Sequence, residues 1–262
     1  MLPAANADMM TTICETPAVS DAEYQARVDL AACYRLAAHY KMTVLIYTHI
    51  TARVPGEPEH FLINPYGFLW EEITASSLVK IDVNGNKVCS SPHRVNPAGF
   101  TIHSAVHTGR EDAHWVMHTH TRSGVAVSCL AEGLLPINQI ALQFFGRVSY
   151  HDYEGVALNL GERERIVASL GTNPALILRN HGLLTVGPDA AVMFSHMFNL
   201  CRACEIQESA LAMGRPLQNL DEATMRQATG QIDQMAYDDG DVQLEWDAHM
   251  RMLDRLDPGF RD

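Results

Sequence analysis

The sequence predicts an α/β fold, with a β-sheet that carries helices on its faces. Short apolar segments of strand character, such as Ala175–Leu178, alternate with longer segments of helical periodicity, such as Asp189–Met213. No internal repeat or long linker interrupts this alternation, and a composition of 47% hydrophobic and 19% charged residues provides an ample core. We therefore expect a flexible leader over residues 1–20, which are rich in Ala, Thr and Pro, and a single domain over residues 21–262.

The first helix is expected from Asp21 to about Tyr40, because Asp21 suits an N-cap and the apolar residues that follow recur at helical spacing. Apolar and β-branched residues over Met42–Ala52 predict a strand. A second strand is expected to begin at Phe61–Ile63, after the turn-forming residues Pro55-Gly56-Glu57-Pro58.

The dipeptide Asn84-Gly85 predicts a hairpin between strands Leu78–Val83 and Lys87–Cys89, since Asn-Gly suits a type I′ turn. The remaining elements are expected in the following order: a helix over Phe100–Thr108, a strand with His118 and His120, a helix or turn over Ser123–Glu132, a strand over Arg147–Tyr150, a helix over Gly161–Leu170, a strand over Ala175–Leu178, a helix over Asp189–Met213, and one or two helices over Leu220–Leu256.

Composition argues against several classes of partner. The formal net charge of −12 should repel nucleic acid and anionic membrane surfaces, and we find no basic run that reverses it locally. No apolar stretch approaches the roughly 20 residues that a bilayer requires. Residues 1–20 lack the pattern of a signal peptide, and the six cysteines lack disulfide-framework spacing. We therefore expect a cytoplasmic protein whose partner is a small molecule, not nucleic acid or a membrane.

Two histidine-bearing segments predict a metal site. His118 and His120 are spaced i, i+2, which in a strand places both imidazoles on one face, roughly 6.6 Å apart along the chain. His181 follows the apolar run Ala175–Leu178 and precedes Gly182, as expected for a strand that ends in a tight corner. Taken alone, the first pair is equally consistent with two polar side chains on a half-exposed strand. The third histidine favours a shared divalent cation.

Several motifs in a fixed order resemble the class II aldolase/adducin family over about residues 28–214. The motifs are Thr48–Arg53 (THITAR), Leu62–Gly67 (LINPYG), Ile73–Leu78 (ITASSL), His118–Thr121 (HTHT) and Asn180–Gly187 (NHGLLTVG). The resemblance implies a three-layer α/β/α domain with a central, largely antiparallel sheet, followed by C-terminal helices. It also implies that His118, His120 and His181 bind one divalent metal ion, of Zn, Mn or Fe, in each subunit.

Three departures from the family pattern bear on the reaction. The aldolases carry a glutamate that binds the metal or acts as general acid/base, and the matching position here is Gly99. Their two small hydroxyl residues that hold the substrate phosphate match Pro97 and Ala98, and a tyrosine from a neighbouring subunit matches Gln139. The resemblance thus implies that the chain is not a sugar-phosphate aldolase. We expect the pocket to be open at Gly99, with room for a flat carboxylate-bearing substrate.

The resemblance also supplies candidate substrate-binding residues. His49 stands where the aldolases have an asparagine in the phosphate pocket, and Arg53 beside it suits a carboxylate. The alternative for Arg53 is an ion pair with Glu57 or Glu59. The expected substrate-binding set is His49, Thr51, Arg53, Gly67 and Gln139.

Three residues are candidates for proton transfer. His103 lies one turn beyond Gly99, and the alternative for it is a packing role. His151 and Tyr153 belong to a segment that the family places near the metal, and the alternative for them is a structural turn.

Three histidines leave coordination positions open, which is typical of a catalytic site. We therefore expect a metal-dependent lyase that breaks a C–C bond, by decarboxylation or retro-aldol cleavage, in an unphosphorylated hydroxylated aromatic or oxo carboxylic acid through a metal-stabilised enolate. One alternative is a non-haem Fe(II) oxygenase, and another is a non-catalytic, adducin-like interaction module. A homotetramer is expected by resemblance and from the apolar stretch Gln139–Phe145, which suits an interface.

Overall fold

The structure, a computed structural model, describes residues 19–155 and 161–262, so most of the expected leader lies outside the described residues. Its centre is a seven-stranded sheet with the order β3-β2-β1-β4-β7-β6-β5. All neighbouring strands are antiparallel except β5 and β6, which are parallel. The strands are β1 (His49–Val54), β2 (Glu57–Ile63), β3 (Val79–Asp82), β4 (Trp115–Thr119), β5 (Val148–His151), β6 (Ala175–Leu178) and β7 (Gly182–Gly187).

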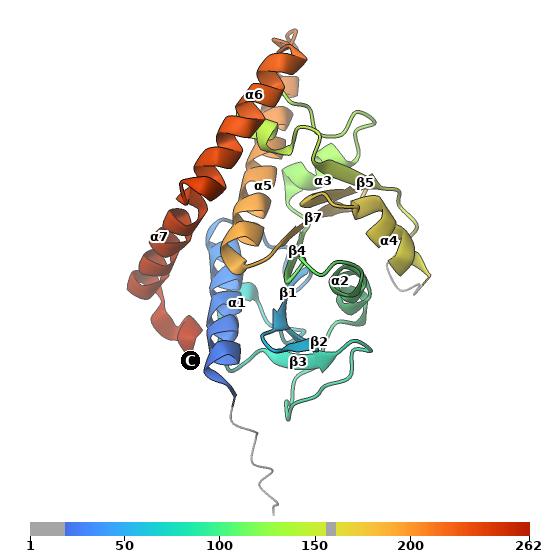
Figure 1. Cartoon of the computed structure of the whole chain (residues 1–262). Coiled ribbons are helices and arrows are strands. Elements are labelled where there is room, and N and C mark those ends of the chain that lie inside the picture. Colours follow the sequence, from blue (N-terminus) through green and yellow to red (C-terminus); the bar gives the residue numbers. More distant parts are fainter. Residues whose placement is uncertain (1–18, 156–160) are drawn as a thin grey trace, which may run out of the picture.

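Helices cover both faces of this sheet, which confirms the predicted three-layer α/β/α architecture (Figure 1). One layer contains α1 (Asp21–His39), α5 (Ala190–Ala212) and the short α3 (Arg122–Ser128), which packs against α5. The opposite layer contains α2 (Pro97–Gly109) and α4 (Glu162–Leu170). The C-terminal helices α6 (Glu222–Asp233) and α7 (Asp241–Leu256) lie outside α5 and α1.

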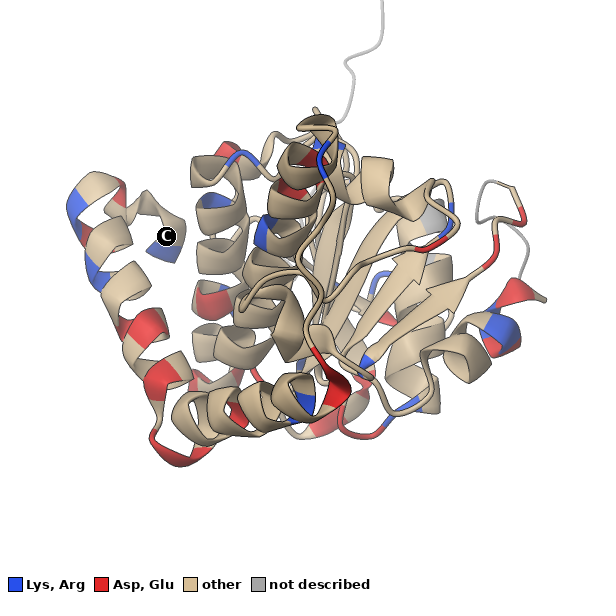
Figure 2. Ribbon diagram, turned by 90° about the horizontal axis from the view of Figure 1, so that it is seen from above, with Lys and Arg blue, Asp and Glu red and all other residues tan. Residues whose placement is uncertain are grey.

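Strand alternation divides the core between the two layers. In β4, Met117 packs into the core beneath α1 and α5, whereas Val116 packs into the core beneath α2 and α4. All five residues of β4 are buried, as expected of a central strand. Most charged residues lie on helices and loops (Figure 2). Strands β4, β5, β6 and β7 contain none, whereas β1, β2 and β3 at one side of the sheet carry five. Among the described residues, no helix is long and apolar enough to span a bilayer.

Several predicted boundaries are wrong. The strand expected over Met42–Ala52 begins only at His49, because Lys41, Leu45 and Thr48 adopt left-handed backbone conformations that no strand accommodates. The helix expected from Phe100 begins at Pro97. Strand β7 was not predicted. The apolar pattern predicted β6 and a tight corner after it, but not the strand that follows the corner.

The Asn84-Gly85 turn also differs from the prediction. A type I′ turn requires a positive φ at both residues, but only Gly85 has one. The carboxylate of Asp82 instead accepts hydrogen bonds from the backbone N–H groups of Asn84 and Asn86, both at 2.8 Å. The returning arm pairs with β3 only through an isolated bridge between Ile81 and Lys87.

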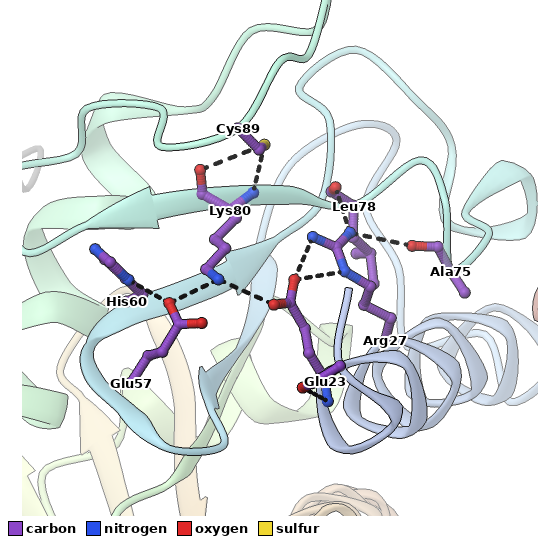
Figure 3. A network of polar contacts seen from close by, with 9 residues as sticks. Glu23, Arg27, Glu57, His60, Ala75, Leu78, Lys80 and Cys89 are labelled. Carbon is purple, nitrogen blue, oxygen red and sulfur yellow. Dashed lines mark hydrogen bonds and ion pairs between the residues drawn. The ribbon is translucent and has the colours of Figure 1, made fainter. Parts of the chain in front are cut away.

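A buried ionic network anchors α1 to the edge of the sheet (Figure 3). Glu23, which is 4% exposed, accepts hydrogen bonds from Arg27 at 2.7 and 2.9 Å. It also lies 2.9 Å from Nζ of Lys80 on β3, which contacts Glu57 of β2 at 2.7 Å. Arg27 donates a further hydrogen bond to the carbonyl of Leu78. The network thus joins α1, β2 and β3 through the ammonium of Lys80, which contacts the carboxylates of both Glu23 and Glu57.

We expect Glu23→Ala to lower the free energy of unfolding by about 3 kcal/mol, because it leaves Arg27 and Lys80 without their shared buried partner. Urea denaturation measures this change. The matched control is Glu222→Ala, which removes an exposed ion pair with Arg226 and should cost less than about 1 kcal/mol. Equal losses in the two variants would contradict the assignment of Glu23 as the centre of the network.

Candidate metal centre

Three histidines converge where β4 ends and β7 begins. Their candidate ligand atoms all lie within 4.8 Å of one another, and the Nε2 atoms of His118 and His120 are 2.8 Å apart. The ring centroid of His181 lies 4.8 Å from that of His118 and 4.7 Å from that of His120. The cluster predicted from the spacing of these residues is therefore present.

The turn before β7 brings His181 into this cluster. Asn180 adopts a φ of 57°, a left-handed conformation that asparagine tolerates better than most residues, and its N–H donates to the carbonyl of Ser128. A Cβ on Gly182 would stand 2.5 Å from the carbonyl oxygen of Thr119 and 2.9 Å from the ring of His120. Glycine at residue 182 therefore permits the close backbone approach that the sequence suggested.

Hydrogen bonding and burial prepare the imidazoles as metal ligands. His118 Nδ1 lies 2.9 Å from the carbonyl of Leu183 and must donate to it, so the neutral ring presents a bare Nε2 to the cluster. Burial, together with His181 and His120, holds the pKa of His118 well below its ordinary value. Burial and His120 lower the pKa of His181 to about 4, and burial lowers the pKa of His120. At neutral pH the three are uncharged nitrogen donors, which fits a divalent cation.

His49 completes the site from the neighbouring strand. It begins β1 directly opposite His118, and its side chain is turned toward α2. A Cβ on Gly99 would stand 2.8 Å from two atoms of the His49 ring and 2.9 Å from a third. The pocket does reach Gly99, as expected, but the space into which a side chain at residue 99 would extend is filled by the imidazole of His49. Thr48, immediately before it, has a φ of 66°, which is a strained conformation for a β-branched residue.

A chain of buried hydrogen bonds runs behind His49. His107 Nδ1 lies 2.7 Å from the carbonyl of Ala113 and must donate to it, so His107 Nε2 accepts from the Thr51 hydroxyl, also at 2.7 Å. Thr51 Oγ1 then accepts from His103 Nδ1 at 2.7 Å. This sequence leaves His103 with a bare Nε2, and its ring lies against His49 with centroids 3.9 Å apart. The predicted residues Thr51 and His103 thus support the site from behind His49.

A cavity of roughly 380 Å³ opens onto this cluster. Tyr153, which is 54% exposed, lines it together with the three metal-site histidines and His49. None of the described residues that line it is Asp, Glu, Lys or Arg. Six lining residues were not predicted from the sequence as site residues: Tyr47, Thr48, Tyr66, Asn96, Ile102 and Gly155. Thr48 and Tyr66 nevertheless lie within the quoted motifs.

Six predicted residues do not line this cavity. Two of them, Thr51 and His103, lie behind His49 as described above, and the other four lie elsewhere. Arg53 donates to the carbonyls of His107 and Arg110 and lines a different cavity, and it pairs with neither Glu57 nor Glu59. His151 points toward α4, where Nδ1 contacts the Ser169 hydroxyl at 3.0 Å and Nε2 lies 3.5 Å from Glu162. Gln139 lines a cleft beside α5 and α7. Gly67 has a φ of 107° and follows Tyr66, which does line the cavity.

Comparison with known families matches residues 28–208 to the class II aldolase and adducin N-terminal domain. The chain belongs to this family. A Caulobacter vibrioides relative named "Putative aldolase class 2 protein" is 55% identical over 246 residues, which cover 93% of this chain and 95% of that protein. Rat alpha-adducin is 48% identical over 197 residues, which cover 74% of this chain but only 27% of alpha-adducin.

Solved structures of family members share the fold. An aldolase II superfamily protein from Pseudomonas syringae has a TM-score of 0.88 and 47% identity, covering 93% of this chain and 98% of that one. An L-fuculose 1-phosphate aldolase from Glaciozyma antarctica has a TM-score of 0.81 and 25% identity, covering 100% and 97%. Family membership therefore includes both aldolases and adducins, and the site itself must distinguish them.

We expect His118→Ala, His120→Ala and His181→Ala each to lower zinc affinity at least about tenfold, because three ligands leave little redundancy. Zinc titration and metal analysis of protein purified without chelator measure the effect. His39→Ala, at the exposed end of α1, is the control and should bind zinc like the wild type. Stoichiometric zinc in the His181→Ala protein would refute the site.

Burial of neutral histidines should make the fold acid-sensitive. Burial lowers the pKa of His49 and of His107 to about 3, and that of His103 well below its ordinary value. Since the unfolded chain binds protons near pH 6.5, stability should fall as the pH drops from about 6.5 toward 3. His107→Gln should flatten this dependence by about 1.4 kcal/mol per pH unit, measured by urea denaturation between pH 6 and 4. An unchanged slope in the variant would contradict this account.

Proposed function

We propose that this protein is a divalent-metal-dependent carbon–carbon lyase that acts on a small, unphosphorylated carboxylic acid with a hydroxyl or oxo group. The convergence of His118, His120 and His181 on one point is the observation that carries the proposal. These histidines would hold the cation, which when bound supplies Lewis acidity toward an oxygen of the substrate. Decarboxylation and retro-aldol cleavage both draw on that chemistry.

The composition of the cavity supports the choice of substrate. The two small hydroxyl residues that hold the phosphate in the aldolases are matched here by Pro97 and Ala98, and the described lining contains no lysine or arginine that could replace them. Tyr47, Tyr66 and Ile102 offer apolar surface suited to a flat, aromatic substrate. A volume of roughly 380 Å³ lies within the range of small-molecule sites.

Proton transfer must use groups other than carboxylates, since no acidic side chain lines the described part of the cavity. Tyr153 is the proposed proton donor, because it lines the cavity and carries a hydroxyl on a residue that is 54% exposed to solvent. His103 is assigned a supporting role, because its ring lies behind His49 and is not among the lining residues. His151 receives no role in this proposal.

An adducin-like interaction module is the second candidate, favoured by the 48% identity to rat alpha-adducin. That identity covers about a quarter of alpha-adducin, so the partners of the whole protein do not transfer to this chain. Such a module needs no open metal site. A protein that binds no divalent cation and turns over no acid would support this second candidate.

We expect the zinc- or manganese-loaded protein to turn over a hydroxylated aromatic or oxo acid, and not to cleave L-fuculose 1-phosphate at enzymatic rates. Loss of a general acid/base group typically costs about 10²–10⁴-fold in rate, and Gly99 supplies none. A substrate screen with detection of carbon dioxide and aldehyde measures this, with His181→Ala as the inactive control. Efficient cleavage of the sugar phosphate would refute the proposed substrate class.

A further inference from the structure

The His49 ring lies on a surface that α2 provides for it. Gly99 and His103 are four residues apart and share one face of that helix. Three atoms of the His49 ring lie where a Cβ on Gly99 would contact them, and the His103 ring lies against the His49 ring at a centroid distance of 3.9 Å. The imidazole is therefore held between strand β1 and one turn of α2.

Gly99 is required for space and not for backbone conformation. It lies inside α2 without a positive φ, where glycine is less favourable than alanine. Any Cβ at this position would stand within 2.9 Å of the His49 ring. A side chain at residue 99 and the observed position of His49 thus exclude each other.

His49 is buried without the hydrogen bonds that would stabilise it. Only 3% of the residue is exposed, and neither ring nitrogen makes a hydrogen bond of normal geometry within the described residues. The backbone of Gly99 lies close enough to offset part of the lowering of the His49 pKa by burial, but it does not satisfy the ring. Buried polar groups in proteins are nearly always partnered, so an unpartnered one that lines a cavity indicates a ligand. The cavity that His49 lines also holds the three metal-site histidines.

We propose that His49 donates a hydrogen bond to a carboxylate of the bound ligand, and that Gly99 and the Thr51–His103–His107 chain hold its ring in place for this contact. The inference rests on the proposed function and specifies how that site selects its substrate. A carboxylate on residue 99 would repel an anionic ligand, whereas a neutral imidazole in the same space can donate to one. A site with the His49 imidazole in this space, and no carboxylate on residue 99, should therefore bind carboxylic acids as ligands.

The decisive variant is His49→Phe, which retains the ring volume and removes both nitrogens. Oxalate, a small dicarboxylate, is the probe, and isothermal titration calorimetry on zinc-loaded protein measures its affinity. We expect oxalate affinity to fall about tenfold or more, as for a lost hydrogen bond to a charged group. Zinc affinity and melting temperature should not fall, because a buried unpartnered imidazole is replaced by an apolar ring of similar shape. Unchanged oxalate affinity would overturn the inference.

Gly99→Ala tests the exclusion between the two residues. The added methyl group should displace the His49 ring and weaken oxalate binding, but it should have little further effect when His49 is already Ala. Zinc affinity, measured on all four proteins of this double-mutant cycle, establishes that the metal centre is intact. Additive losses of oxalate affinity would contradict the proposed coupling between residues 49 and 99.

Thr51 tests the supporting chain. Thr51→Val keeps the shape of the side chain and breaks both hydrogen bonds, whereas Thr51→Ser keeps the hydroxyl group. We expect Val to weaken oxalate binding without a change in zinc affinity, and Ser to restore it. Equal oxalate affinity in the Val and Ser proteins would remove the positioning role. Wild-type protein that binds zinc but no oxalate would instead refute the carboxylate substrate class, and therefore the proposed function.

Discussion

The candidate metal centre depends on the close approach of two backbone segments, the end of β4 and the beginning of β7. Because Thr119 pairs with Leu183, the chain at Gly182 passes directly against the carbonyl of Thr119. A side chain at residue 182 would force these segments apart and separate the imidazoles. The left-handed turn at Asn180 directs the chain into this approach, and the carbonyl of Leu183 then fixes the ring of His118. Backbone geometry thus sets the ligand cluster before any cation binds.

Several histidines are buried around the metal centre, on β1, β4 and α2, and burial keeps them uncharged. Charging any of them in a dry interior costs desolvation energy, and each charge would raise the cost of the next. Their hydrogen bonds therefore have defined directions, from the carbonyl of Ala113 through His107 and Thr51 to His103. This order leaves a bare Nε2 on His103, whose ring lies against His49. A rigid, oriented set of neutral donors is what a preorganised metal and ligand site requires.

Local sequence pattern predicted the parts of the site that depend on local geometry. The i, i+2 spacing of His118 and His120, and the glycine after His181, were sufficient to infer the cluster, because strand alternation and close backbone approach are local properties. The contact of His49 with Gly99 was not predictable in this way, because it depends on the register between β1 and β4 and on how α2 packs over both. Positive φ values at Leu45 and Thr48 likewise leave no clear mark in residue type, so the start of β1 was misplaced.

The resemblance to the aldolases implies an acidic residue at position 99, where this chain has glycine, and in the structure the ring of His49 occupies the adjacent space. Removing a side chain from a packed interior normally leaves a cavity that destabilises the fold, unless a neighbour fills it. Here the neighbour is His49, which comes from β1 and lies directly across from His118. The space in front of α2 therefore remains chemically functional, with a neutral imidazole in place of an anion. Since both β1 and α2 are regular elements held by the core, they keep this neutral imidazole in a fixed position beside the three histidines.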